Sequence, residues 1–552
     1  MAAKTQNEIT KQVTTKYLDS LDLKNLPTPA TIEESLLAAT NKAFDAENVA
    51  RKGSHKINLL KRLTFSQVAQ ILVYLHKVAR ITPSGRNTDR DLDLLAIYAD
   101  QGEDEGIYVT SEDHIRRIAR QYNRELTINE FKEVMTVLRE EAPRLSRCSD
   151  RDMVPVNNGI FDYRTKELHP FDPGYVFLSK ARVNYNANAL SHGIQTPDGD
   201  TWEVEEWMET LSDDPEIVNL LWEILGAIIR PHVRWNKSAW FYSEKGNNGK
   251  GTLVELMRNL VGTASYASIP ISDFGKDFLL EPLTRASAIL VDENDVGTFV
   301  DRAANLKAII TNDVISINRK YKTPIAYQFW GFMVQCLNEF PKIKDRSDSF
   351  YRRQLFVPFN KSFTGAEKRY IKDDYVTRAE VLEYVLKRVL HMDYYVLSEP
   401  EATQLVLAEY KTYNDPVRAF WDEFEDAFVW DLLPFQFLYD LYKSWFAKTN
   451  PSGSPIGRSG FVRDLVGIVE KSTVFYCTDK SAKIRSARRM VAPEPLILRF
   501  DLKDWMNQSY QGNDPLKRGL CYPQSPNYRG VLRYKGTQPA AGDDDEDDTA
   551  TS

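Results

Sequence analysis

A loop rich in glycine and asparagine holds the residues of this sequence that are best suited to chemistry. It reads KGNNGKGT from Lys245 to Thr252. Glycines allow backbone N–H groups to close around an anion, and a lysine in such a loop reaches the β- and γ-phosphates of a nucleotide. We therefore predict that Lys250 acts on the phosphates of ATP. The predicted nucleotide contacts are Gly246, Asn247, Asn248, Gly249, Lys250, Gly251 and Thr252.

The loop departs at two positions from the usual nucleotide-binding pattern, G-x-x-x-x-G-K-[ST]. Glu244 stands where the first glycine is expected, and Gly251 follows the lysine directly. Gly246 and Thr252 are the nearest substitutes, so the hydroxyl of Thr252 becomes the predicted Mg²⁺ ligand. The alternative is an ordinary turn between a strand and a helix. The apolar, aromatic run before the loop and the helical spacing after it favour the phosphate-binding interpretation.

Two acids end a later apolar run at residues 286–291. We predict that Asp292 holds Mg²⁺ through water and that Glu293 orients and deprotonates the attacking water. A strand that merely ends in a charged turn is the alternative. The position of the two acids, after the phosphate loop in the chain, favours the catalytic interpretation.

Further polar groups follow a third apolar run, 332–337. The amide of Asn338 could hydrogen-bond the γ-phosphate or the attacking water. Arg352 and Arg353 come next, and one of them is predicted to reach the nucleotide of a neighbouring subunit as an arginine finger. The sequence does not distinguish the two, because adjacent side chains on a strand point to opposite faces. A pair of arginines on a solvated surface is the alternative.

The elements that must position these groups fall into five predicted segments, and the predicted fold class is multidomain α/β. The segments are a helical N-terminal region (1–93), an α+β domain (94–200), an ATPase domain (201–395), a winged-helix-like domain (400–535) and an acidic disordered tail (536–552).

The predicted C-terminal domain contains three helices, a strand at 474–477, a basic run and a second strand at 496–500. A third helix followed by a basic wing is an arrangement that binds DNA. The candidate DNA contacts are Arg458, Lys483 and Arg485. A small packing domain without a ligand is the alternative.

Composition and charge limit the class of protein. The 552 residues are 42% hydrophobic, which is typical of a globular protein with several domains. The net charge of -7 is not typical of a nucleic-acid binder, but six acids lie in the tail between 543 and 548, so basic clusters elsewhere can act locally. We find neither an apolar run that could span a membrane nor a secretory signal. Four dispersed cysteines form no CxxC pair, so we expect a reducing, cytoplasmic setting.

The ordered set of the Lys250 loop, Asp292–Glu293, Asn338 and the arginine pair resembles the superfamily 3 helicases of phages, plasmids and small DNA viruses. More narrowly, the chain resembles the helicase part of the phage and plasmid primase–helicases, a family that includes the poxvirus primase–helicase. The segment VNNGIFDYRTKELHPFDPGY, which begins at Val156, is similar to the region upstream of the ATPase in that family. The resemblance covers roughly residues 94–475.

This resemblance implies an AAA+-type P-loop ATPase core that uses ATP and Mg²⁺ at sites between the subunits of a homo-hexameric ring. It implies translocation on single-stranded DNA and unwinding of forked DNA, with a separate primase or other replication proteins as partners. If the protein is phage-encoded, it would act in the host cell cytoplasm. The hairpin predicted at 315–324 would line the ring channel, where Lys320, Tyr321 and Lys322 would contact DNA. A solvated surface turn is the alternative for this hairpin.

The predicted function is thus that of an ATP-dependent replicative DNA helicase. One alternative is an origin-binding initiator whose ATP site switches assembly, and another is a complete primase–helicase. Strand separation with ATP turnover stimulated by single-stranded DNA would favour the helicase over the initiator. Template-dependent primer synthesis would indicate a primase.

Overall fold

The structure is a computed structural model that describes residues 4–85, 89–300, 302–320, 322–449, 455–478, 482–486, 488–507, 509–518 and 525–534. The chain divides into two compact units, Met1–Leu407 and Ala408–Ser552. Within the described ranges, we find no helix that combines the length and apolar character required to cross a membrane. The acidic tail predicted for 536–552 lies outside the described residues.

Three helices begin the first unit: α1 (Gln6–Asp19), α2 (Pro29–Asn48) and α3 (Phe65–Leu75). Each starts after a threonine whose side chain accepts a hydrogen bond from a backbone N–H three residues later. The backbone N–H groups of Thr5 and Thr64 in turn donate to the side chains of Glu8 and Gln67, which completes a capping box at the first turns of α1 and α3.

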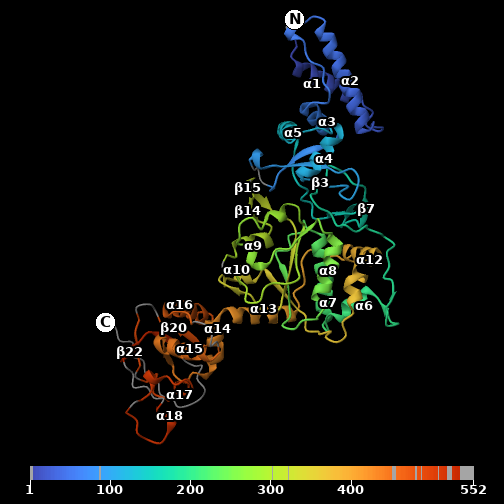
Figure 1. Cartoon of the computed structure of the whole chain (residues 1–552). Helices are drawn as coiled ribbons and strands as arrows, with labels where there is room; N and C mark the ends of the chain where they lie inside the picture. Colours follow the sequence, from blue (N-terminus) through green and yellow to red (C-terminus); the bar gives the residue numbers. More distant parts are fainter. Residues whose placement is uncertain are drawn as a thin grey trace. The chain divides into compact units, whose positions relative to one another are not determined.

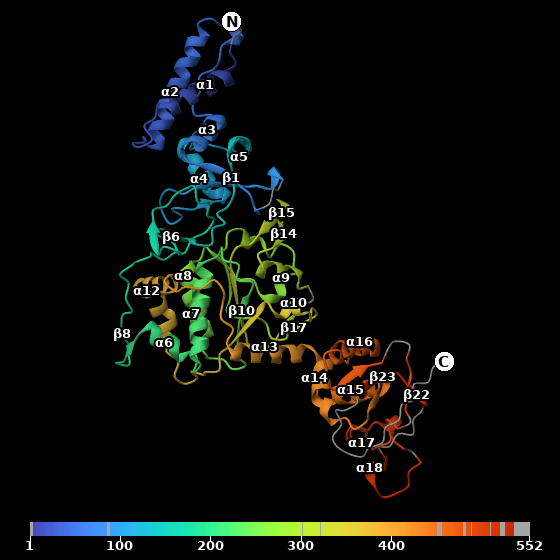
Figure 2. The same ribbon diagram turned by 180° about the vertical axis from the view of Figure 1, so that it is seen from behind.

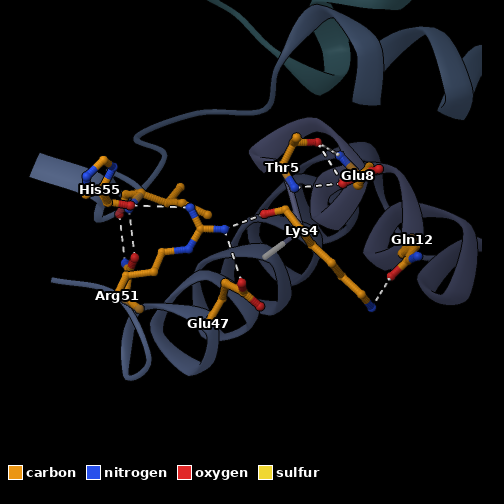
Figure 3. A network of polar contacts seen from close by, with 9 residues as sticks. Lys4, Thr5, Glu8, Gln12, Glu47, Arg51 and His55 are labelled. Atoms are coloured by element: carbon orange, nitrogen blue, oxygen red, sulfur yellow. Dashed lines mark hydrogen bonds and ion pairs between the residues drawn. The ribbon is translucent and has the colours of Figure 1, made fainter. Parts of the chain in front are cut away.

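Arg51 joins the end of α2 to the start of α1 (Figure 3). Its Nη2 donates to the backbone carbonyl of Lys4 and, at 3.1 Å, to Oε1 of Glu47. Its Nη1 donates to the carbonyl of His55 at 3.3 Å. These bonds close the open end of the α1–α2 hairpin.

A four-stranded sheet in the order β3-β2-β1-β4 packs with these helices. Its strands are β1 (Val78–Ile81), β2 (Leu94–Tyr98), β3 (Tyr108–Val109) and β4 (Arg144–Leu145). β1 and β2 are antiparallel neighbours, with Ile81 opposite Leu94. The boundary predicted between 93 and 94 therefore cuts a single sheet and is wrong. The physical reason is that both strands bury apolar side chains in the same core, which they share with α4 (Glu112–Tyr122) and α5 (Ile128–Glu141).

A small antiparallel sheet and two helices lead into the main domain. The sheet consists of β5 (Met153–Val156), β6 (Gly159–Asp162) and β7 (Glu167–His169). β5 and β6 form an antiparallel hairpin, with Val154 opposite Phe161. The short strands β8 (Ile194–Gln195) and β9 (Thr201–Trp202) follow, and then the helices α6 (Val204–Thr210) and α7 (Pro215–Ile229).

A five-stranded sheet forms the centre of the first unit, and all its strands are parallel. In spatial order they are β11 (Tyr266–Ala267), β12 (Ala288–Val291), β16 (Phe332–Leu337), β10 (Ser238–Tyr242) and β18 (Gln354–Pro358). β12, β16 and β18 are buried throughout, as expected for a parallel sheet covered on both faces. Because the strands are parallel, their carboxyl ends meet at one edge.

Helices α7, α8 (Lys250–Val261) and α12 (Ala379–Leu390) pack together on one side of this sheet (Figure 1). Figure 2 shows the same three helices from behind. Their apolar residues and the strands share one large hydrophobic core. The helix α8 starts at Lys250, so the last three residues of the predicted loop, Lys250 to Thr252, already belong to its first turn. The short helix α10 (Asp348–Tyr351) precedes β18.

The hairpin predicted at 315–324 consists of β14 (Val314–Arg319) and β15 (Lys322–Gln328), which pair in antiparallel fashion. Its base is bound to the N-terminal part of the same unit. Arg147 Nη1 donates to the hydroxyl of Tyr327 at 2.9 Å, and Arg147 Nη2 donates to the carbonyl of Pro83 at 3.1 Å. The hairpin is thus fixed at its base.

The second unit has its own aromatic-rich core. Its helices are α14 (Pro416–Phe424), α15 (Phe435–Thr449) and α16 (Arg458–Val469), and its sheet is formed by β19 (Leu432–Pro434), β23 (Gly530–Arg533) and β20 (Phe475–Cys477).

The strand predicted at 496–500 is wrong, because this segment forms the helix α17 (Pro495–Arg499). Pro495 presets the backbone of the first helical turn, and Leu496 and Ile497 enter the core from that helix. A short apolar run does not by itself distinguish strand from helix. The strand that pairs with β20 is instead β23, which comes later in the chain.

Candidate functional site

The glycine-rich loop leaves the carboxyl end of β10 and ends at Gly249, which caps α8 with a φ of 85°. Other residues rarely adopt this left-handed conformation. A Cβ on Gly249 would also lie 2.5 Å from Cδ2 of Leu211, so glycine is required here. A Cβ on Gly246 would meet nothing within 4 Å. The loop is thus closely packed at Gly249 and open at Gly246. The backbone N–H groups of the first turn of α8 follow directly after Gly249.

The two loop asparagines hold the loop in shape. Asn248 Nδ2 donates to the carbonyl of Lys245 at 2.6 Å, and Asn248 Oδ1 accepts from the backbone N–H of Lys250 at 3.3 Å. Asn247 has a φ of 56° and donates from Nδ2 to Oε1 of Glu367 at 2.6 Å. Both asparagine side chains thus bond to the protein.

Lys250 points from α8 toward the neighbouring strand β16 and is only 6% exposed. Its Nζ donates to the carbonyls of Ser243 and Leu337, at 3.3 and 3.0 Å, and to Oδ1 of Asn338 at 2.8 Å. These partners are neutral, and burial lowers the pKa of Lys250 to about 8. The structure therefore brings two predicted site residues, Lys250 and Asn338, into direct contact. The buried ammonium of Lys250 has no negatively charged group among these three hydrogen-bond partners.

Asp292 follows the carboxyl end of β12 and is bound by Arg258, which lies on α8 about two turns after Lys250. Arg258 Nη2 donates to Oδ1 of Asp292 at 2.8 Å, and Nη1 donates to Oδ2 at 3.3 Å. These hydrogen bonds hold the pKa of Asp292 below its usual range. The next acid, Glu293, is exposed. Sequence reasoning missed Arg258, because only the packing of α8 against β12 brings it to Asp292.

A buried amide pair fixes the spacing between β12 and β16. Asn294 Nδ2 donates to Oε1 of Gln335 at 3.0 Å and to the carbonyl of Cys336 at 3.1 Å. Gln335 Nε2 in turn donates to the carbonyl of Ile269 at 3.1 Å. Sequence reasoning missed both amides, although a glutamine inside an otherwise apolar strand was a usable signal.

The residues at this edge fit the triphosphate of ATP. Lys250 and the first turn of α8 supply positive charge, and Asn338 supplies an amide beside them. Thr252, partly exposed in that first turn, and Asp292, whose carboxylate is bound by Arg258, are the residues here that could supply oxygen atoms to Mg²⁺. In the part of the chain that the structure describes, we find no cluster of three or more metal-ligating side chains. Few protein ligands suffice for Mg²⁺, which is bound largely by phosphates and water in such sites.

The arginine pair lies at the opposite edge of the sheet. β18 starts next to the start of β10, with Gln354 opposite Ser238, whereas the phosphate loop follows the end of β10. Five residues of strand separate the two edges by about 13 Å. Arg352 is exposed, whereas Arg353 donates from Nη1 to Oγ of Ser349 at 2.8 Å. The structure thus does not bring either arginine to the phosphate loop of its own subunit.

The predicted DNA contacts lie in two separate places. On the hairpin, Lys322 Nζ lies 3.0 Å from Oε1 of Glu112 on α4, and Lys320 stands at the turn. Tyr321 lies outside the described residues. In the second unit, Arg458 is the exposed first residue of α16, and Lys483 and Arg485 are exposed around the short strand β21 (Ile484–Arg485).

Three family models match successive segments of the chain. The D5 N terminal like family matches residues 51–213, a family of unknown function (DUF5906) matches 241–353, and the poxvirus D5 protein-like family matches 412–492. Two D5 matches thus flank the segment with the loop, the acids and the arginine pair. The chain is similar to the D5-like primase–helicases. This resemblance was predicted from the sequence, and it is confirmed.

Solved structures also align with this D5-like chain. The apo structure of the NrS-1 C terminal region (305-718) is 13% identical, with a TM-score of 0.41, and the alignment covers 76% of this chain and 96% of that chain. The A form apo structure of the same region is 14% identical, with a TM-score of 0.39, over 72% of this chain and 85% of that chain.

Proposed function

We propose that this D5-like chain is an ATP-dependent replicative DNA helicase of superfamily 3 type, with an AAA+-type P-loop ATPase core. The observation that carries the proposal is the convergence of three groups at one edge of a parallel sheet. The loop after β10, the acids after β12 and Asn338 after β16 all follow carboxyl ends of strands. Ligands of open parallel sheets bind at this edge.

The proposed mechanism assigns one task to each group. Lys250 and the N–H groups of α8 bind the phosphates, and Asn338 orients the γ-phosphate or the attacking water. Glu293 accepts a proton from that water, since it is exposed and not engaged by Arg258. Thr252 and Asp292 would hold Mg²⁺, which would neutralise negative charge on the phosphates.

A ring of identical subunits would complete the site. Arg352, exposed at the far edge of the sheet, can serve the phosphates of a neighbouring subunit. We propose a homo-hexamer that acts on single-stranded and forked DNA, with separate primase or other replication proteins as partners. The three helices and small sheet of the second unit support a winged-helix-like DNA-binding domain.

The test compares ATP hydrolysis and forked-DNA unwinding for the full chain and three variants. Lys250→Ala should abolish hydrolysis, and Glu293→Gln should bind ATP but hydrolyse it very slowly. Lys276→Ala is the control, because this exposed lysine pairs with Asp273 and has no predicted role in the site. The proposal fails if the unchanged chain neither hydrolyses ATP nor unwinds DNA, or if Glu293→Gln turns over ATP at the normal rate.

A further inference from the structure

The segment after β18, residues 360–374, runs beside the phosphate loop, and we call it the strap. The backbone N–H of Phe363 donates to the carbonyl of Asn247 at 2.7 Å, and Glu367 accepts from the side chain of Asn247. Tyr370 and Ile371, on the short helix α11 (Arg369–Asp373), pack against the main hydrophobic core. The strap is therefore hydrogen-bonded to the loop at Phe363 and Glu367 and packed against the core at Tyr370 and Ile371.

One strap residue, Lys372, lies at the start of α8. A Cβ built on Gly251 would stand 3.6 Å from Lys372 Nζ, so the ammonium is next to the first helical turn. The charge of Lys372 also contributes, after the larger effect of Arg258, to lowering the pKa of Asp292. These two observations place the ammonium beside the first turn of α8, close enough to Asp292 for the two charges to interact.

The charges around Lys372 do not balance within the protein. A cation beside the positive end of a helix is unfavourable. Asp292 is already bound through both oxygens by Arg258. The neighbouring Lys368 differs, because it pairs with Asp198 and Asp200 at 3.8 and 3.5 Å. Within the described residues, Lys372 has no ion pair of this kind.

We propose that Lys372 is a second phosphate-binding cation of the same subunit, which contacts the terminal phosphates of the nucleoside triphosphate held by the Lys250 loop. This inference rests on the proposed function. Gly251 is consistent with this role, because it leaves open the space that a side chain would fill beside the ammonium.

The experiment measures the affinity of the full chain for ATP and AMP by titration calorimetry in EDTA. Without divalent metal, an effect on the affinity cannot arise through Mg²⁺ at Asp292. Lys372→Met should weaken ATP binding about tenfold or more, since a hydrogen bond between charged groups is lost, and should leave AMP binding unchanged. Lys372→Arg should retain most of the ATP affinity. Lys368→Met, a few residues earlier on the strap, is the matched control and should bind ATP normally.

The possible results separate the two proposals. If Lys372→Met binds ATP as tightly as the unchanged chain while Lys250→Ala does not, the role of Lys372 is wrong and the nucleotide site stands. Equal weakening of ATP and AMP would also overturn the role, because AMP lacks the terminal phosphates. If the unchanged chain binds no ATP, the proposed function itself fails. A melting temperature for each variant shows whether a loss reflects unfolding, and Lys372→Gln then provides a second neutral replacement.

Discussion

At the scale of single residues, the buried ammonium of Lys250 has a consequence for pH. Burial favours its neutral form, with a pKa of about 8 in the free protein, whereas bound phosphates favour the charged form. Above pH 8, binding must therefore be accompanied by proton uptake. We expect the ATP affinity, measured in EDTA, to fall with rising pH by up to about tenfold per pH unit.

Titrations between pH 7 and 9.5 check this expectation, and Lys250→Arg is the control. An arginine stays charged over the whole range, so its affinity should be flat across the same pH interval. If the arginine variant shows the same decline as the unchanged chain, the pH dependence comes from another group.

The surroundings of the arginine pair also distinguish its members. Arg352→Ala should abolish ATP hydrolysis without lowering the melting temperature, because Arg352 is exposed and would act on a neighbouring subunit. Arg353→Ala should destabilise the fold by about 1 kcal/mol, because its guanidinium bonds to Ser349. Thermal melting and ATPase assays of both variants measure these effects.

Mixing Arg352→Ala protein with Lys250→Ala protein should restore some hydrolysis at shared interfaces. If no hydrolysis is restored, the arginine acts within its own subunit.

At the scale of elements, the β14–β15 hairpin is the predicted DNA contact that the structure constrains most. Lys322 pairs with Glu112, but both side chains are about half exposed, so the ion pair stabilises the fold little and is readily exchanged for phosphate. We expect Lys320→Ala/Lys322→Ala to keep its basal ATPase while DNA stimulation and unwinding fall together. The salt dependence of single-strand binding should become shallower, by roughly 0.7 in log–log slope for each lost contact.

Glu112→Gln is the matched variant for the hairpin, since it releases Lys322 without removing a cation. Its single-strand binding should equal or exceed that of the unchanged chain. Normal unwinding by the double lysine variant would show that the hairpin is a solvated surface turn.

At the scale of the whole molecule, the two units have separate hydrophobic cores. A chain that ends at Asn414, the last residue of α13 (Glu401–Asn414), should therefore fold and bind ATP with unchanged affinity. Its affinity for DNA should fall, since Arg458, Lys483 and Arg485 are removed. Circular dichroism, ATP titration and DNA binding of this shorter chain test the prediction. An unfolded product would show that the first unit depends on the second.

The sequence by itself determined the elements of the candidate site. The strand before the loop, the helix after it, the strand before Asp292 and the strand before Asn338 all lie where apolar spacing predicts them. These features are local, since glycine content, apolar periodicity and strand ends depend on neighbouring residues. The order of these groups along the chain also sufficed to predict the resemblance to D5-like proteins, because that order does not depend on which side chains meet in the fold.

Only the tertiary structure decided which side chains meet. Arg258 reaches Asp292 because α8 packs against β12, and Lys372 reaches the loop because the strap returns beside it. Tertiary packing also decided the two places where the predicted elements are wrong, namely the sheet that crosses the boundary predicted at 93 and the helix at 496–500. β1 pairs with β2 on the other side of that boundary, and β20 pairs with β23 rather than with residues 496–500. A short apolar run takes its conformation from the core that buries it.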